Sequence, residues 1–439
     1  MATSFRPYLP EQSWLLPPSP RDWLPEGHLA YFVSDTVDTL DLSGFYERYE
    51  GDGRRNQPFD PRMLVKVLLY AYSTGTFSSR KIARRLEEDV AYRVLAAENF
   101  PAHRTICDFR QQHLASFGEL FVQLVRIARE AGLVKLGTLV IDGTKVKANA
   151  SKHKAMSYGR MVQEEKRLRE QIAALTKRAA AADAAEDAEL GPEVRGDELP
   201  QELQRREQRL EKIREAKARL EARQADEDRA KGRSDDDDRQ SPRGGRRFKR
   251  DFGVPPETAQ SNFTDPESRI MKTPSGFDQC YNGQIAVDED SQLIVETSLT
   301  NNASDNAELI PLLDSVKADL GATPDQVLAD AGYRCEATFL TLEQRQIEAY
   351  ISLGREGKPS LPGDALSASQ RMAESLKTET GSGRYARRKA IVEPVFGWVK
   401  NILGFRRFSF RGEVKARQEW RFLALAVNLK RLHALSLAL

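Results

Sequence analysis

Hydrophobic positions in the first 130 or so residues have the spacing of helices. Asp60-Pro61 predicts a helix start, with Asp60 as N-cap and proline at the first helical position. The apolar stripe that follows is Met63, Leu64, Val67, Leu68 and Ala71. After the break at 73–76, Ser78 or Ser79 caps a second helix that runs through Val90, and a later helix is predicted over 105–132. Residues 1–134 are therefore expected to form an all-helical N-terminal domain.

The two helices on either side of this break resemble a helix-turn-helix. The second helix carries basic residues on its polar face, namely Arg80, Lys81, Arg84 and Arg85. In DNA-binding modules of this kind the second helix enters the major groove. Helix pairs with basic solvent faces are also common in purely structural modules, so both interpretations stay open.

From residue 135 the pattern changes to short strands that alternate with helices. Strands are predicted at 137–147, 281–287, 293–299, 326–329 and 348–353, and helices at 305–320, at 338–344 and from about 387. The order is βββαβαβα, which predicts an α/β domain over 135–435 with a mixed sheet. The apolar stretch 422–439 predicts a buried terminal helix.

Residues 155–255 interrupt this domain after its first strand. Leu203, Leu210, Ile213 and Leu220 fall on heptad positions in a sequence rich in charged residues and alanine. A Gly-Pro break near 191 divides two helical halves, which predicts a helical hairpin. The hairpin packs on itself, pairs with a second chain or serves as a solvated spacer. The charge clusters in 232–252 are typical of a disordered linker.

Composition indicates a soluble protein whose charge is unevenly distributed. Hydrophobic residues make up 40% and charged residues 30%, and three distant cysteines predict neither disulfides nor zinc. No secretory signal peptide and no transmembrane helix are expected. The net charge is only +2, yet thirteen Lys and Arg residues against three Glu give the segment 384–431 a charge of +10. That segment predicts a partner with dense negative charge.

Three acidic residues stand where the predicted elements bring them together. Asp142 and Asp330 each end an apolar strand run, and Glu393 lies on the late helix. Oxygen ligands of this kind suit Mg²⁺ or Mn²⁺, and two such ions promote phosphoryl transfer. The alternatives are a turn at Asp142, a helix N-cap at Asp330 and a surface charge at Glu393 paired with Lys389 or Lys400.

Several motifs in order resemble the DDE-type transposases of bacterial insertion sequences. They are VIDGTKVKANAS (140–151), NFTDPESRIMK (262–272), YNGQIAVD (281–288), VLADAGY (327–333) and YARRKAIVEPVFGWVKNILGFRRFSFRG (385–412), with 59–86 and 103–110 in the helical part. The resemblance implies a ribonuclease-H-like fold, divalent metal and DNA cleavage with strand transfer. It implies Asp142, Asp330 and Glu393 as the catalytic, metal-binding triad. It also implies a homodimer acting in the bacterial cytoplasm, at the nucleoid, on double-stranded element ends and target DNA.

The family signature Y-x2-R-x3-E-x6-K is only partly met. Tyr385, Arg388 and Lys400 fit, but one extra residue separates Arg388 from Glu393, and Lys389 occupies the expected position. Which of the two basic residues contacts DNA stays open. Lys400, seven residues after Glu393, is predicted on the same helix face, near a phosphate.

The stretch 404–411 interleaves aromatic and basic residues. Arg406, Arg407 and Arg411 are predicted to contact DNA phosphates. Phe405, Phe408 and Phe410 either stack on bases or belong to the core.

Two other functions fit the same sequence. A ribonuclease-H-like nuclease without strand transfer would use the same three acids. A domesticated DNA-binding protein would use none of them.

Overall fold

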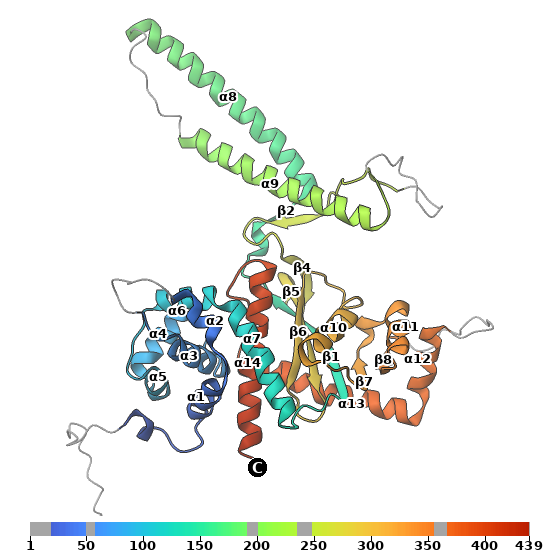
Figure 1. Cartoon of the computed structure of the whole chain (residues 1–439). Helices are drawn as coiled ribbons and strands as arrows, with labels where there is room; N and C mark the ends of the chain where they lie inside the picture. The colour runs from blue at the N-terminus through green and yellow to red at the C-terminus, as the bar shows by residue number, and fades with distance from the viewer. Residues whose placement is uncertain (1–18, 50–57, 191–200, 235–247, 355–366, 439) are drawn as a thin grey trace, which may run out of the picture.

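The computed structural model describes residues 19–49, 58–190, 201–234, 248–354 and 367–438. Its N-terminal part is helical, as predicted (Figure 1). Asp60 caps α3 by accepting a hydrogen bond from the backbone N–H of Arg62. The helices are α1 (Leu29–Thr39), α2 (Ser43–Tyr46), α3 (Pro61–Ser73), α4 (Ser79–Glu88), α5 (Val90–Ala96), α6 (His103–Gln112) and α7 (Leu114–Glu130).

Two helix boundaries in this part were predicted wrongly. The second helix ends at Glu88, because Asp89 adopts an extended backbone and caps α5 through the N–H of Ala91. The helix expected over 105–132 is two helices that meet at His113. His113 is buried and its ring lies 4.5 Å from that of Phe109, so packing overrides the continuous apolar pattern.

A mixed sheet forms the second half of the structure. Its strands are β1 (Thr138–Lys147), β4 (Arg269–Thr273), β5 (Gly276–Asp288), β6 (Ile294–Thr300), β7 (Gln326–Ala329) and β8 (Glu348–Ile351). The order is β4-β5-β1-β7-β8, with β6 also paired to β5. β1, β7 and β8 are parallel, whereas β5 is antiparallel to β1, β4 and β6. This arrangement is consistent with a ribonuclease-H-like domain, and β4 is a strand that the predicted order lacked.

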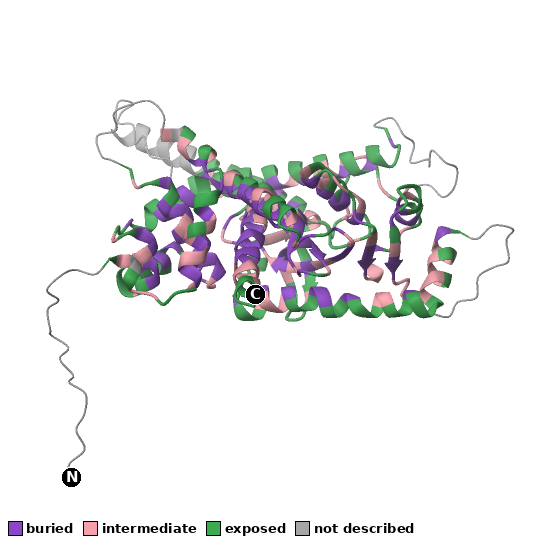
Figure 2. Ribbon diagram, turned by 60° about the horizontal axis from the view of Figure 1, so that its bottom comes forward, coloured by how far each residue is buried: buried purple, intermediate pink, exposed green. Residues whose placement is uncertain are grey.

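The helices after β6 cover this sheet. They are α10 (Leu309–Leu320), α11 (Glu336–Gln344), α12 (Ala368–Lys377), α13 (Glu379–Gly397), a π-helix (Trp398–Ile402) and α14 (Glu413–Ser436). α13 packs against β1, β7 and β8, while its outer face is exposed (Figure 2). The predicted starts near Asp305 and Arg387 were wrong, because α10 begins at Leu309 and α13 at Glu379. α12 was not predicted.

α14 joins the helical part to the sheet. It packs against α3 and α7 on one side and β6 on the other, and it runs between the two halves in Figure 1. The rings of Phe117 and Phe422 stack at 4.1 Å, and both side chains are fully buried. One continuous hydrophobic core therefore includes both halves. The predicted terminal helix is present and is buried over 422–429, whereas 430–438 are partly or fully exposed.

The interrupting segment forms a helical hairpin that projects from the body (Figure 1). α8 (Tyr158–Leu190) and α9 (Gln201–Ala230) rise from a base in which β2 (Ala155–Ser157) pairs with β3 (Gln260–Asn262). The hairpin packs on itself around Met161, Leu168, Leu210, Ile213 and Leu220. The predicted break between its halves and most of the predicted linker lie outside the described residues. Among the residues that the structure describes, no helix is both long and apolar enough to cross a membrane.

Candidate active site

Asp142 and Asp330 occupy equivalent positions along two neighbouring parallel strands, Asp142 within β1 and Asp330 directly after β7. The last pair of residues between β1 and β7 is Ile141 and Ala329, and each aspartate follows its member of that pair. Asp142 is not at a strand end or in a turn, as the sequence analysis considered, but within β1, where it pairs with Ile285. Asp330 leaves the sheet and caps the short helix Ala331–Tyr333 through the N–H of Gly332, so the N-cap alternative also holds.

Asp142 is mostly buried and forms an ion pair with Arg388 of α13. The Nη1–Oδ2 distance is 2.9 Å. Burial raises the pKa of Asp142, the positive charge of Arg388 opposes this, and nearby Asp330 adds to it. Arg388 itself is buried, so of the two basic residues considered for DNA contact, Lys389 is the exposed one. Tyr385 is half-buried and its ring lies 5.9 Å from the Arg388 guanidinium.

Lys400 contacts β1 at Thr144, which lies two residues after Asp142 and on the same face of the strand. Its ammonium contacts the hydroxyl of Thr144 and lies 3.3 Å from the carbonyl oxygen of Lys145. Burial lowers the pKa of Lys400. Because Lys400 belongs to the π-helix that follows α13, the regular α-helical spacing from Glu393 does not continue to it.

Glu393 lies on the exposed face of α13, apart from this contact network. It forms no hydrogen bond or ion pair with any residue that the structure describes, so the alternative of pairing with Lys389 or Lys400 was wrong. No group of three or more His, Cys, Asp or Glu side chains within the described ranges is arranged to hold a metal ion. The structure thus brings Asp142 and Asp330 together, without Glu393.

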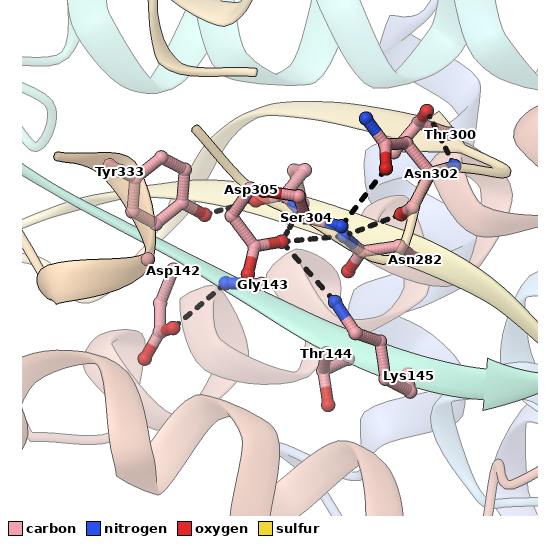
Figure 3. A network of polar contacts seen from close by, with 12 residues as sticks. Asp142, Gly143, Thr144, Lys145, Asn282, Thr300, Asn302, Ser304, Asp305 and Tyr333 are labelled. Carbon is pink, nitrogen blue, oxygen red and sulfur yellow. Dashed lines mark hydrogen bonds and ion pairs between the residues drawn. The ribbon is translucent and has the colours of Figure 1, made fainter. Parts of the chain in front are cut away.

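A further acid, Asp305, lies on the opposite face of β1 (Figure 3). Its carboxylate accepts hydrogen bonds from Gln284 at 2.8 Å and from Asn282, and pairs with Lys145 at 3.3 Å. The same carboxylate lies against Gly143 and Gly332, where an added Cβ would come within 2.9 and 3.1 Å of its oxygens. Asp305 therefore packs between the backbone segments that carry Asp142 and Asp330.

The helix predicted over 305–320 would place Asp305 at its N-terminus, where an aspartate commonly serves as a cap. This placement was wrong, because α10 begins four residues later. Tyr333 joins the same network by donating to Gln284. The available signal was that Asn282 and Tyr333 both fall within motif stretches, 281–288 and 327–333.

The segment 404–411 presents its basic residues and buries its aromatic ones. Phe405, Phe408 and Phe410 belong to the core, so that alternative is confirmed over base stacking. The side chains of Arg406, Arg407 and Arg411 are exposed. Glu419 of α14 fixes the loop by accepting from the backbone N–H of Ser409 at 2.7 Å. Glu419 also accepts from Tyr72 of α3, which in turn accepts from Arg110 of α6.

On α4, Arg80, Lys81 and Arg84 are exposed. Arg84 pairs with Glu88 at 2.8 Å. This arrangement fits a DNA-contacting face and a structural helix pair equally.

Two family models match the chain. Residues 18–112 match the Transposase domain (DUF772), and residues 255–429 match the Transposase DDE domain. Asp330 and Glu393 lie within the second match, while Asp142 and the helical hairpin lie between the two. Neither the comparison with curated proteins nor that with solved structures found a significant match. The chain therefore carries two transposase domains, an N-terminal transposase domain followed by a transposase DDE domain.

Proposed function

We propose that this protein is a DDE transposase that hydrolyses phosphodiester bonds at the ends of an insertion sequence and transfers the freed strand into target DNA. The observation that carries the proposal is the pair of aspartates, Asp142 and Asp330, on adjacent parallel strands of a chain with two transposase domains. The proposed domains are 1–134 for DNA binding and assembly and 135–435 for catalysis, with 155–255 inserted.

The two aspartates fit a divalent cation in their chemistry. Both donors are carboxylate oxygens, as Mg²⁺ and Mn²⁺ prefer. The Asp142 carboxylate already stabilises a positive charge, the guanidinium of Arg388 at 2.9 Å. Glu393 is the proposed third ligand, so a complete site requires α13 to bring it closer. Two bound ions would activate the attacking oxygen and stabilise the leaving one.

The remaining residues around Asp142 bind and orient the substrate. Lys400 is held by Thr144, two residues from Asp142 on the same strand, where its ammonium can pair with a DNA phosphate. Arg388 keeps the buried Asp142 carboxylate neutralised in the absence of DNA. Asp305 fixes the spacing of the two aspartate-bearing segments from the opposite face.

The proposed partners are double-stranded element ends and target DNA, bound by a homodimer in the bacterial cytoplasm. The proposed DNA contacts besides Lys400 are Tyr385, Lys389, Arg406, Arg407, Arg411, Arg80, Lys81 and Arg84.

The test is a cleavage assay on labelled duplexes taken from the DNA that flanks the coding region, with Mg²⁺ or Mn²⁺. We expect Asp142→Asn to reduce cleavage by about 10³-fold or more. The matched control is Asp314→Asn, an exposed aspartate of α10 that pairs with Arg345. Cleavage by Asp142→Asn at the wild-type rate would contradict the catalytic role of Asp142, and no cleavage by wild type would leave the non-catalytic alternative. Cleavage without joining to a target plasmid would leave the nuclease alternative.

A further inference from the structure

A groove lies at the foot of the helical hairpin, where β1 runs out toward the insertion. Its volume is about 530 Å³. One wall is the loop 149–154 and the other is the basic segment 404–411. Charged and titratable side chains dominate the lining, namely Lys152, His153, Lys154, Arg407, Arg411 and Asp278.

The groove concentrates positive charge that the protein itself does not neutralise. Lys152, Lys154, Arg407 and Arg411 are exposed, and none forms an ion pair with a residue that the structure describes. The single acid, Asp278, is already paired with Lys147 at 2.9 Å, and this contact lowers the pKa of the carboxyl. Four unpaired cations in one groove repel each other, and binding of a polyanion relieves that repulsion.

The walls of the groove are held in place by backbone contacts. The N–H of Lys147 donates to the carbonyl of Arg406 at 3.1 Å, and that of Phe408 donates to the carbonyl of Lys147 at 2.9 Å. Asn149 donates to the carbonyl of Ser409 at 2.7 Å. Because Phe408 is also fully buried, the arginines beside it project from a fixed segment. The groove is therefore formed before any ligand arrives.

The groove lies on the line of β1 beyond the aspartate pair. Asp142 and Lys147 are five residues apart on this strand. At roughly 3.3 Å per residue this is about 17 Å. Successive phosphates of one DNA strand are about 3.4 Å apart along the helix axis. For a duplex whose axis runs parallel to β1, this distance corresponds to about five nucleotides.

We propose that this groove binds the sugar–phosphate backbone of duplex DNA, about five nucleotides from the phosphate that reacts at Asp142. The position relative to the reacting phosphate rests on the proposed function, whereas binding of the backbone does not. The contacts are charge contacts, so they add affinity and orientation without reading sequence. The foot of the insertion thereby becomes part of the DNA-binding surface.

The experiment compares the full-length double variant Lys152→Gln/Lys154→Gln with wild type. The matched control is Lys317→Gln/Lys377→Gln, two exposed lysines on α10 and α12. Binding of a fluorescein-labelled duplex of about 40 base pairs from the flanking DNA is measured by anisotropy over a range of KCl concentrations. The slope of log K against log[KCl] is negative, and each lost phosphate contact reduces its magnitude by about 0.9. We expect a decrease of about 1 to 2 for the groove variant and no change for the control.

A second series of binding measurements locates the groove contact relative to the cleavage position. Duplexes are shortened one base pair at a time, separately on each side of the cleavage position. On one side, the difference between variant and wild type should disappear once fewer than about five base pairs remain. An unchanged slope in the groove variant overturns the proposal, even if wild type cleaves DNA. A changed slope together with an inactive wild type retains the groove as a DNA site and removes the transposase mechanism.

Discussion

Nη1 of Arg388 on α13 lies 2.9 Å from Oδ2 of Asp142 on β1, so an arginine neutralises the first acid of the proposed metal site. A metal ion bound to Asp142 must share this carboxylate with the guanidinium or displace it. The ion pair therefore makes protein stability and metal binding depend on each other.

Arg388→Gln should destabilise the metal-free protein and increase its response to Mn²⁺. Removal of one partner leaves Asp142 buried without a counter-charge, which should lower the free energy of unfolding by about 2 kcal/mol. Mn²⁺ should restore more stability to the variant than to wild type, as measured by the shift in Tm. Arg387→Gln is the control, because Arg387 is exposed and pairs with Glu289 instead. Equal Mn²⁺ shifts in all three proteins would contradict the coupling.

Glu393→Gln should abolish cleavage without affecting stability. Glu393 is exposed and has no partner among the described residues, so the free energy of unfolding should change by less than about 0.5 kcal/mol. Loss of a metal ligand should nevertheless reduce cleavage by about 10²-fold or more. Glu379→Gln, at the start of the same helix, serves as the control. If Glu393→Gln cleaves normally, the third ligand is a different residue.

Asp305→Asn should slow cleavage while DNA affinity stays unchanged. The substitution turns an amide N–H₂ toward donors such as Gln284 and Lys145, and we expect a loss of about 1 to 3 kcal/mol in stability. Displacement of the Gly143 and Gly332 segments should lower kcat by about tenfold to a hundredfold. Cleavage kinetics measure the change in kcat, and fluorescence anisotropy measures DNA affinity. A change confined to KM or to DNA affinity would argue against a positioning role.

Stability should decrease between about pH 4.5 and 8 because of Glu296 on β6. Burial raises its pKa to about 8 against the attraction of Arg421, which lies 3.0 Å away. The folded protein binds this proton more tightly than the unfolded chain, so the stabilisation is complete below the unfolded pKa and lost as pH rises toward 8. The change is at most about 5 kcal/mol. Glu296→Gln should flatten the profile from urea unfolding, whereas Glu343→Gln on the surface should not.

The strands of the sheet could be predicted because their patterns are local. The apolar runs around Ile141 and Ala329 are each followed by an acid, and α11 connects β7 to the parallel strand β8 as a βαβ unit. β4 was missed because it is a short edge strand whose Ile270 is exposed, so its alternation does not indicate a buried face.

The contacts of the candidate site could not be predicted in the same way. The partner of Arg388 is 246 residues away in the sequence, and only the packing of α13 on β1 brings the two together. The position of Glu393 depends on how α13 is rotated about its axis, and the π-helix after Gly397 ends the regular spacing from which the position of Lys400 was predicted. Asp305 resembled a helix cap because its hydrogen-bond donors come from β1 and β5, which local sequence does not reveal.

The pairing at the foot of the hairpin also bears on how the chain folds. About 130 residues separate β1 from β5. The two ends of this long loop must meet before β1 can pair with β5. The hairpin has its own core, and β2 and β3 hold its two ends together. Once it has formed, only about 22 residues of loop remain, which lowers the entropic cost of closure by about 1.5 kcal/mol. Formation of the hairpin thus favours the pairing of β1, the strand that carries Asp142, with β5.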